Sequence, residues 1–146
     1  MKIAIASDHA GFRLKEALKT FLSEKGHAVA DFGTDNETSV DYPDFGVKAA
    51  KAVANDTCES GILVCYTGIG MSIIANKVKG IRAALCHNQL TVEMSRRHNN
   101  ANVLCLGSRI VPEELAKELA GLWLSTPFEG DRHLRRVNKI SDYEKT

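Results

Sequence analysis

The sequence has almost no excess of charge of either sign, with a formal net charge of +1 over 146 residues. A chain so nearly neutral has no global attraction for nucleic acid or for an anionic membrane, and we expect neither as a partner. It also lacks any apolar run approaching the ~20 residues that span a bilayer. The opening stretch MKIAIASDHAG is interrupted by Asp8 too early for a signal peptide. These absences predict a cytoplasmic protein, unless an export signal has been removed.

No two of the four cysteines form a C-x-x-C pair, and their spacing fits neither a zinc knuckle nor a disulfide framework. Cys86 and Cys105 lie in the apolar runs IRAALC and NVLCLG, which predicts buried thiols that act as small hydrophobic side chains. Cys58 lies in the polar stretch NDTCES and is predicted to be in a loop. Cys65 is different, because it ends an apolar run immediately before a glycine turn.

Short β-branched runs alternate with helical patterns along the chain. Strands are predicted at KIAIAS, HAVADFG, GILVC, IRAALC and NVLCLG. Helices are predicted over residues 12–26, 45–56, 70–80, 89–99 and 112–126, and in the tail from about Arg132. Such alternation predicts right-handed crossovers and a five-stranded parallel sheet with helices on both faces. Without an internal repeat or linker, residues 1–146 are predicted to form one domain, an α/β Rossmann-like three-layer sandwich.

The residues that follow each strand are the candidates for a site, because ligands of parallel sheets bind at the carboxyl ends of the strands. After the third strand, CYTGIG places Gly68 and Gly70 where the backbone can approach a ligand closely. The next helix would turn free N–H groups toward the same place, which is typical of a site for a phosphate or an oxyanion. The dinucleotide motif G-x-G-x-x-G fails here because its third position is Ile73.

Cys65 and Thr67 add reactive groups to this turn. A helix N-terminus and neighbouring donors stabilise a thiolate, which can act as a base or a nucleophile. An isolated cysteine would by default be an inert core residue, but the glycine turn and Thr67 favour the functional interpretation. In SDHAG, Asp8 is equally consistent with a helix cap and with a catalytic role, and His9 is harder to explain by capping. Both would share a cleft with Cys65 if the first and third strands are neighbours.

The tail carries a basic face. Arg132, Arg136 and Lys139 share one side of the predicted helix by their spacing, while apolar residues form another side. This pattern is typical of a solvated face on a packing helix, and it also suits a phosphate clamp, because guanidinium binds phosphate bidentately. The apolar stripe could dock on a second subunit. Nucleic-acid binding is disfavoured, since the patch is short and lacks interleaved aromatic residues.

Six segments of the chain carry a family resemblance when they are taken together: SDHAG, VDYPDF, GILVCYTGIGMSIIANK, GIRAAL, RRHNNANVLCLGSR and FEGDRHLRRV. They resemble the ribose-5-phosphate isomerase type B family, which also includes galactose-6-phosphate isomerase subunits. The resemblance runs from Met1 to about Ile140, with the motifs in family order and spacing. It implies that the protein interconverts an aldose phosphate and a ketose phosphate through a cis-enediol, without metal or organic cofactor. It also implies a homodimer or tetramer whose active site lies between subunits.

The resemblance assigns roles to the glycine turn first. Cys65 would be the base that moves a proton between the two sugar carbons, with help from Thr67. The backbone N–H groups of the turn would stabilise the enediolate and contact the substrate. This turn consists of Tyr66, Thr67, Gly68, Ile69 and Gly70.

Other strand ends and the tail would complete the site. His98 would be the acid–base group that opens the furanose ring, Asp8 would handle hydroxyl protons, and Asn99 would bind the sugar. The remaining expected contacts to the sugar or its phosphate are His9, Tyr42, Arg109, Arg132 and Arg136. The tail helix, about residues 131–145, is expected to pack on a partner subunit, so part of the site would come from a second chain.

Three positions depart from the usual family pattern. Met71 stands where some members have a glutamate base, which favours the cysteine mechanism here. Tyr66 replaces a small residue or an aspartate and leaves the sugar open, and Asp131 replaces the second glycine of the usual GGRH motif, where we expect it to weaken the phosphate clamp slightly. The preferred reaction is the interconversion of ribose 5-phosphate and ribulose 5-phosphate. The alternatives are an allose or galactose 6-phosphate isomerase and a non-catalytic sugar-phosphate binding module.

Overall fold

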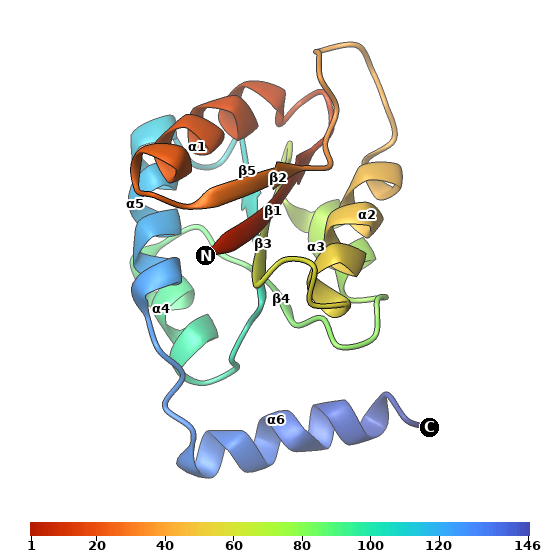
Figure 1. Ribbon diagram of the computed structural model, residues 1–146, viewed down its shortest axis with the longest axis vertical. Coiled ribbons are helices and arrows are strands. Elements are labelled where there is room, and N and C mark those ends of the chain that lie inside the picture. Colours follow the sequence, from red (N-terminus) through yellow and green to blue (C-terminus); the bar gives the residue numbers. More distant parts are fainter.

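Five parallel strands form one sheet in the order β2-β1-β3-β5-β4 in the computed structural model, which describes residues 1–146 (Figure 1). The strands are β1 (Lys2–Ser7), β2 (Ala28–Asp31), β3 (Ser60–Cys65), β4 (Ala83–Leu85) and β5 (Val103–Gly107). The helices are α1 (Phe12–Glu24), α2 (Tyr42–Ala54), α3 (Ile69–Ala75), α4 (Gln89–Arg97), α5 (Glu113–Ser125) and α6 (Asp131–Tyr143). The predicted all-parallel α/β sheet is therefore confirmed.

Each face of the sheet has its own hydrophobic core, because successive side chains of a strand point to opposite faces. On one face, Ile3, Ile62 and Leu104 pack with α1, α4 and α5. On the other face, Ala4, Leu63 and their neighbours pack with α2 and α3. Figure 1 shows these two sets of helices on opposite sides of the strands. The three-layer arrangement predicted from the alternating pattern is thus confirmed.

Several element boundaries differ from the sequence prediction by a few residues, among them those of α3 and α2. The third helix ends at Ala75 rather than Gly80, because the Asn76 side chain bonds both the N–H and the carbonyl of Ala83 and so turns the chain toward β4. Helix α2 begins at Tyr42, three residues earlier than predicted, with a proline in its first turn. All four cysteines are buried and free, including Cys58 in its predicted loop. No helix combines the length and apolar character that crossing a membrane requires.

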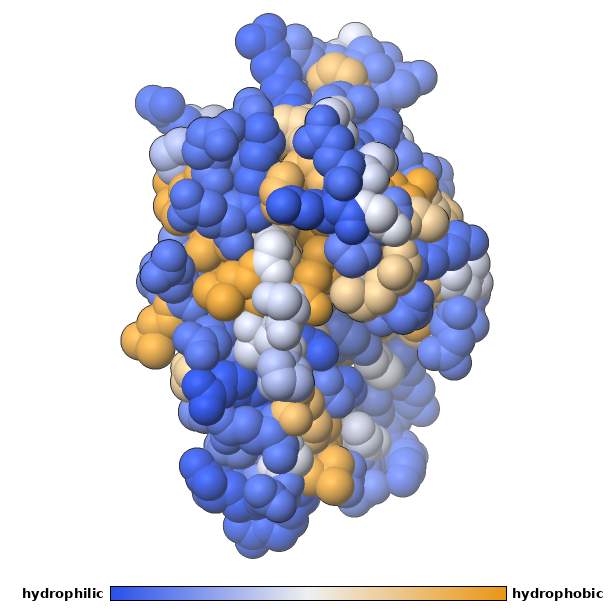
Figure 2. All heavy atoms as spheres, turned by 60° about the vertical axis from the view of Figure 1, so that its left-hand side comes forward, coloured by the Kyte–Doolittle hydropathy of each residue, from blue (hydrophilic) through white to orange (hydrophobic).

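Helix α6 stands apart from the three layers, beyond the amino-terminal ends of the strands (Figure 1). Val137 is buried, and the carboxylate of Glu144 accepts the Gly80 N–H at 3.0 and 3.1 Å, so both the middle and the end of the helix touch the body. Leu134 and Ile140 are about half exposed. Figure 2 shows hydrophobic patches among hydrophilic side chains on this face, some of them at the lower end where α6 lies.

Candidate active site

Asp8 and Cys65 occupy matching positions at the ends of the neighbouring strands β1 and β3. Ser7 pairs with Val64 in the register of β1 and β3, so the next residues along each strand are Asp8 and Cys65. Both side chains are buried, with exposed fractions of 6% and 5%. The Asp8 carboxylate accepts the Gly11 N–H through Oδ1 at 3.1 Å, and its Oδ2 has no hydrogen-bond donor in the chain. The capping interpretation of Asp8 therefore holds for one oxygen, and the other is free for a ligand.

The glycine turn is built around the Cys65 sulfur. Gly68 has a φ of 80°, in the left-handed region that glycine adopts readily, and its N–H donates to Cys65 Sγ at 3.1 Å. The N–H groups of Gly70 and Met71 have no acceptor within the chain. One amide thus supports negative charge on the sulfur, and two others are free for an oxyanion nearby. Met71, which sequence reasoning considered only as a missing glutamate, joins the site through its backbone.

Two glycines allow the turn to pack closely on its neighbours: Gly70 lies against the Tyr42 ring, and Gly107 lies against the backbone of Thr67. A Cβ on Gly70 would lie 2.6 Å from the Tyr42 ring, so that ring packs directly on the turn. A Cβ on Gly107, at the end of β5, would lie 2.6 Å from the carbonyl group of Thr67. The Thr67 hydroxyl accepts the Ile69 N–H at 3.3 Å. The structure therefore brings these predicted residues together, as expected from the ends of adjacent elements.

Tyr66 and Arg109 lie at the edge of the same site. The Arg109 N–H donates to the Tyr66 carbonyl at 3.0 Å, which extends the pairing of β3 and β5 into the turn. The Tyr66 side chain is 56% exposed and borders a cavity of about 430 Å³ that Arg13 and Arg109 also line. Neither Cys65 nor Thr67 lines that cavity. The Tyr66 ring and Arg109 therefore border a cavity beside the Cys65 side of the glycine turn.

His9 faces the loop that covers the strand ends. Its Nδ1 accepts the Val40 N–H at 3.1 Å, so the neutral ring carries its proton on Nε2 and can donate from there. Arg13 pairs with Glu37 at 2.8 Å and ties the same loop to α1. Sequence reasoning did not anticipate this loop anchor, because nothing in the spacing of Arg13 and Glu37 indicates a contact.

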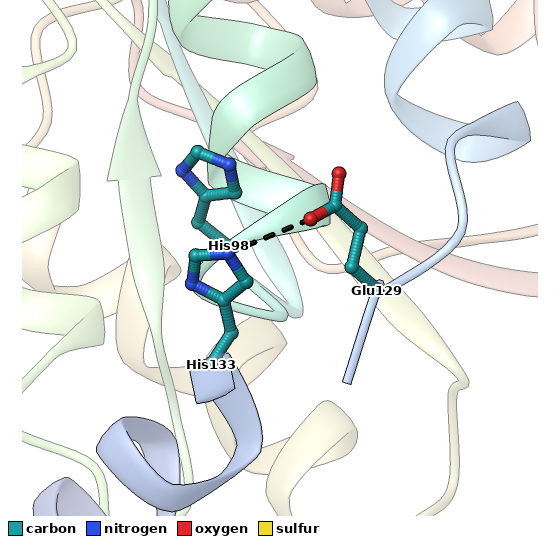
Figure 3. A group of neighbouring side chains, drawn as sticks. All are labelled: His98, Glu129 and His133. Atoms are coloured by element: carbon teal, nitrogen blue, oxygen red, sulfur yellow. Dashed lines mark ion pairs between the residues drawn. The ribbon is translucent and has the colours of Figure 1, made fainter. Parts of the chain in front are cut away.

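A second polar cluster lies at the end of α4 and the start of α6. The His98 and His133 rings stack with 4.1 Å between their centroids and 11° between their planes. Glu129 Oε2 lies 3.5 Å from His133 Nε2, and Glu129 Oε1 pairs with Arg97 Nε at 2.6 Å. Figure 3 shows the carboxylate directed at His133, with the two imidazoles next to each other. This cluster contains one predicted catalytic residue, His98, and two residues to which sequence reasoning gave no role.

Charge is unevenly distributed in this cluster. Burial lowers the pKa of His133, and the nearby charges of His98 and Arg132 lower it further against the opposing effect of Glu129. The hydrogen bond from Arg97 lowers the pKa of the Glu129 carboxyl. The cluster therefore contains a neutral buried imidazole and an ionised carboxylate near neutral pH.

A metal ion is the obvious alternative occupant of this cluster. Ligand atoms of His98, Glu129 and His133 lie within 4.8 Å of one another. The two rings are nearly parallel, however, so their in-plane lone pairs do not converge on one point. The charges of Arg97 and Arg132 also oppose a cation there. The arrangement is better explained as an imidazole held in place by its neighbours than as a metal site.

The two clusters lie at opposite ends of the sheet. Arg109 follows the carboxyl end of β5, whereas His98 and Asn99 precede its amino end. At about 3.3 Å per residue, this strand alone separates them by roughly 16 Å, beyond the reach of a side chain. Arg132 and Arg136 lie at the same end of the sheet as His98, because His133, which stands between them in the sequence, stacks on the His98 ring. One chain therefore does not bring His98, Asn99, Arg132 and Arg136 to Cys65.

The His98 cluster shows what sequence reasoning missed. Glu129 and His133 received no role, and no helical spacing rule indicates the pair, because Glu129 precedes the first residue of α6. Asp131 has a φ of 45°, in the left-handed region. This backbone geometry accounts for the glycine of the usual family motif at that position.

The fold and the carboxyl-edge site together define an α/β protein whose thiol, carboxylate and free amides suit proton transfer on a small anionic ligand. The sequence model of the Ribose/Galactose Isomerase family matches residues 3–140, and the chain belongs to this family. It is 45% identical to ribose-5-phosphate isomerase B of Escherichia coli, over 99% of this chain and 97% of the relative.

Solved structures agree with this family assignment. The ribose-5-phosphate isomerase B of Clostridium thermocellum superposes with a TM-score of 0.98 at 52% identity, covering 99% of this chain and 98% of the other. The isomerase B of Mycoplasma genitalium, solved with bound ribulose-5-phosphate, gives a TM-score of 0.95 at 43% identity over 99% and 96% of the two chains. The family resemblance predicted from the sequence motifs is confirmed.

Proposed function

We propose that this protein is an enzyme that interconverts ribose 5-phosphate and ribulose 5-phosphate through a cis-enediol, as its relatives' names indicate for them. The observation that carries the proposal is the Cys65 sulfur held by the Gly68 N–H beside two free amides. Moving a proton next to a carbonyl requires a base within reach and donors aimed at the developing oxyanion. The turn supplies both, without a cofactor.

Cys65 acts as the base in this mechanism. As a thiolate it removes the proton from C2 of the open-chain aldose, while the carbonyl oxygen on C1 gains negative charge. The Gly70 and Met71 amides stabilise that charge, and Asp8 shuttles protons between the two sugar oxygens. Cys65 then returns its proton to C1, which leaves the carbonyl at C2. Thr67 orients the sugar next to the sulfur.

Ring opening requires His98 and Asn99, which within one chain lie at the opposite end of the sheet from Cys65. We propose a homodimer or a tetramer in which His98 and Asn99 of one chain face Cys65 of another. The separation of about one strand length between the clusters supports this arrangement. The half-exposed Leu134 and Ile140 would give α6 an apolar face to pack on the partner chain.

The phosphate would be held away from the reacting carbons. Arg109 and the Nε2–H of His9 lie on the Cys65 side, and Arg132 and Arg136 would approach from the second chain. A dianionic phosphate bound at a distance provides binding energy that orients the sugar for proton transfer. A catalytic thiol has to stay reduced, which favours the cytoplasm as the compartment.

An isomerase assay on the purified protein tests this proposal, with five- and six-carbon sugar phosphates measured side by side. We expect conversion of ribose 5-phosphate to ribulose 5-phosphate without added metal. Preferential conversion of allose or galactose 6-phosphate would shift the substrate within the class. Tight binding of sugar phosphates with no conversion of any of them would instead indicate a binding module.

A further inference from the structure

We propose that Glu129 and His133 are positioning residues for the ring-opening step and act through the imidazole of His98. The proposal rests on the proposed function, because it concerns how His98 performs its part. Ring opening breaks the bond between C1 and the ring oxygen. The C1 hydroxyl gives its proton to a base while the ring oxygen takes a proton from an acid, and His98 is the acid. An acid of this kind works only when its ring is held in one orientation.

Stacking on His133 fixes the plane of the His98 ring. The centroids are 4.1 Å apart and the planes differ by 11°, a face-to-face contact that permits little tilting of either ring. His98 caps the end of α4 through its own backbone, but the chain gives its side-chain nitrogens no hydrogen-bond partner. The stacked His133 ring is therefore the aromatic neighbour that defines the orientation of His98.

His133 in turn faces Glu129. The His133 side chain is 6% exposed, and its buried Nε2 has no partner within hydrogen-bond geometry; the nearest carboxylate oxygen is Glu129 Oε2, at 3.5 Å. Glu129 is itself fixed twice by Arg97, through the side-chain pair at 2.6 Å and through its N–H, which donates to the Arg97 carbonyl at 3.1 Å. A chain of contacts thus runs from the last turn of α4, through the linker before α6, and back to His98.

The charges around the cluster favour a neutral His133. Arg132 and Arg136 on α6 and His98 on α4 oppose a proton on His133, Glu129 on the linker favours one, and burial opposes one. A neutral ring can stack on His98 in either protonation state of His98 without adding a second positive charge. The buried His133 ring therefore holds His98 in place without taking up the proton that His98 has to donate.

Two readouts on the same protein separate ring opening from proton transfer. Conversion of ribose 5-phosphate requires both steps. Exchange of the C1 hydrogen of ribulose 5-phosphate with heavy water requires only the Cys65 step, because this ketose has no free hydroxyl with which to close a furanose. We expect Glu129→Gln and His133→Ala to lower the turnover of ribose 5-phosphate about 10- to 100-fold, less than loss of an acid–base group itself. Exchange should stay within about twofold of the wild type.

Glu93→Gln is the matched control, because Glu93 is the other carboxylate paired with Arg97 and does not contact His133. We expect wild-type rates in both assays for this variant. His133→Phe should recover part of the loss seen in His133→Ala, since it keeps the stacked ring. In the His133→Phe background, Glu129→Gln should cost nothing further, because Glu129 acts through the His133 nitrogen.

Three outcomes would overturn the proposal. The first is wild-type turnover of ribose 5-phosphate in Glu129→Gln and His133→Ala. The second is an equal fall in turnover and exchange, which would indicate a general loss of structure or assembly. The third is an undiminished effect of Glu129→Gln in the His133→Phe background. Failure of the proposed function is distinct from these, because the wild-type protein would then neither convert ribose 5-phosphate nor catalyse the exchange.

Discussion

The N–H of Gly68 donates to the sulfur of Cys65 across 3.1 Å, inside the turn that joins β3 to α3. This contact distinguishes Cys65 from the other three cysteines, which are also buried. Burial raises the pKa of Cys58, Cys86 and Cys105. A backbone donor on sulfur is what a thiol needs to act as a base, and it makes Cys65 the first position to test.

Replacing Cys65 with alanine should abolish most of the isomerase activity. We expect turnover to fall about 10²–10⁴-fold, the range for a general base, with folding and phosphate binding nearly intact. Steady-state kinetics and circular dichroism measure the two effects. Cys58→Ala is the control, because Cys58 is equally buried but lies in the loop before β3. Full activity in the Cys65 variant would rule out the thiol mechanism.

Mixing two inactive variants tests whether the site is shared between chains. Cys65→Ala and His98→Ala each damage a different cluster, so a mixed dimer contains one site in which both residues are intact. Co-refolding equal amounts should restore about a quarter of the wild-type activity, because about half of the dimers are mixed and each has one good site.

Cys65→Ala mixed with Asp8→Asn is the matched control for this experiment. Both residues lie at the carboxyl edge of the same chain, so neither site of the mixed dimer is intact and no activity should return. Recovery in both mixtures, or in neither, would contradict a site composed of the two clusters from different chains.

Much of this architecture could be predicted from the sequence. Alternating strand and helix patterns gave the parallel sheet, and the rule that ligands bind at carboxyl ends directed attention to Asp8, Cys65 and Gly68. These predictions depend on local pattern and on topology. The strand neighbours β1 and β3 then brought Asp8 beside Cys65.

The remainder depends on contacts between distant segments. The bond from the Val40 N–H to His9 and the stack of His98 on His133 join residues 31 and 35 positions apart, with no spacing rule to reveal them. The early end of α3 follows from the two bonds between Asn76 and Ala83, which override a helical pattern that continues in the sequence. Tertiary packing decided these features.

Gly107 should be intolerant of any side chain. Its Cβ would lie 2.6 Å from the carbonyl carbon and oxygen of Thr67, which are backbone atoms that cannot rotate away. We expect Gly107→Ala to lower the free energy of unfolding by about 1–3 kcal/mol, the range for overpacking, and to reduce activity by displacing the glycine turn that carries Thr67. Urea denaturation and kinetics measure the two effects.

Gly121→Ala is the matched glycine control. Gly121 lies inside α5, and the nearest atom to its Cβ would be Phe21 Cζ at 3.6 Å, an ordinary contact. Alanine there should raise the free energy of unfolding by about 0.5–1 kcal/mol, because it removes backbone freedom from a helix interior. Similar effects of the two substitutions would show that the contact with Thr67 is unimportant.

The buried Lys15 makes stability depend on pH through Asp31. The Lys15 side chain is 1% exposed and pairs with Asp31 and Glu16. Burial alone would raise the pKa of Asp31, but hydrogen bonds from Lys15 and Lys19 lower it overall. A carboxyl whose pKa is lowered by folding stabilises the native state above its unfolded pKa of about 3.9. That contribution is lost as the pH falls through the lower, folded-state value.

Asp31→Asn should therefore be less stable than the wild type at pH 7 by about 3 kcal/mol, because the buried Lys15 ammonium loses one of its two carboxylate partners and keeps only Glu16. The difference should shrink as the pH falls below about 4, because the carboxyl of the unfolded wild type then binds a proton, and it should vanish once the pH has fallen through the lower, native-state pKa. Urea denaturation of both proteins across this range measures it. Lys15→Met is the control, since an apolar side chain of similar length replaces the buried charge and should cost little. A difference between wild type and Asp31→Asn that stays constant from pH 7 to pH 3 would show that the ion pair contributes nothing.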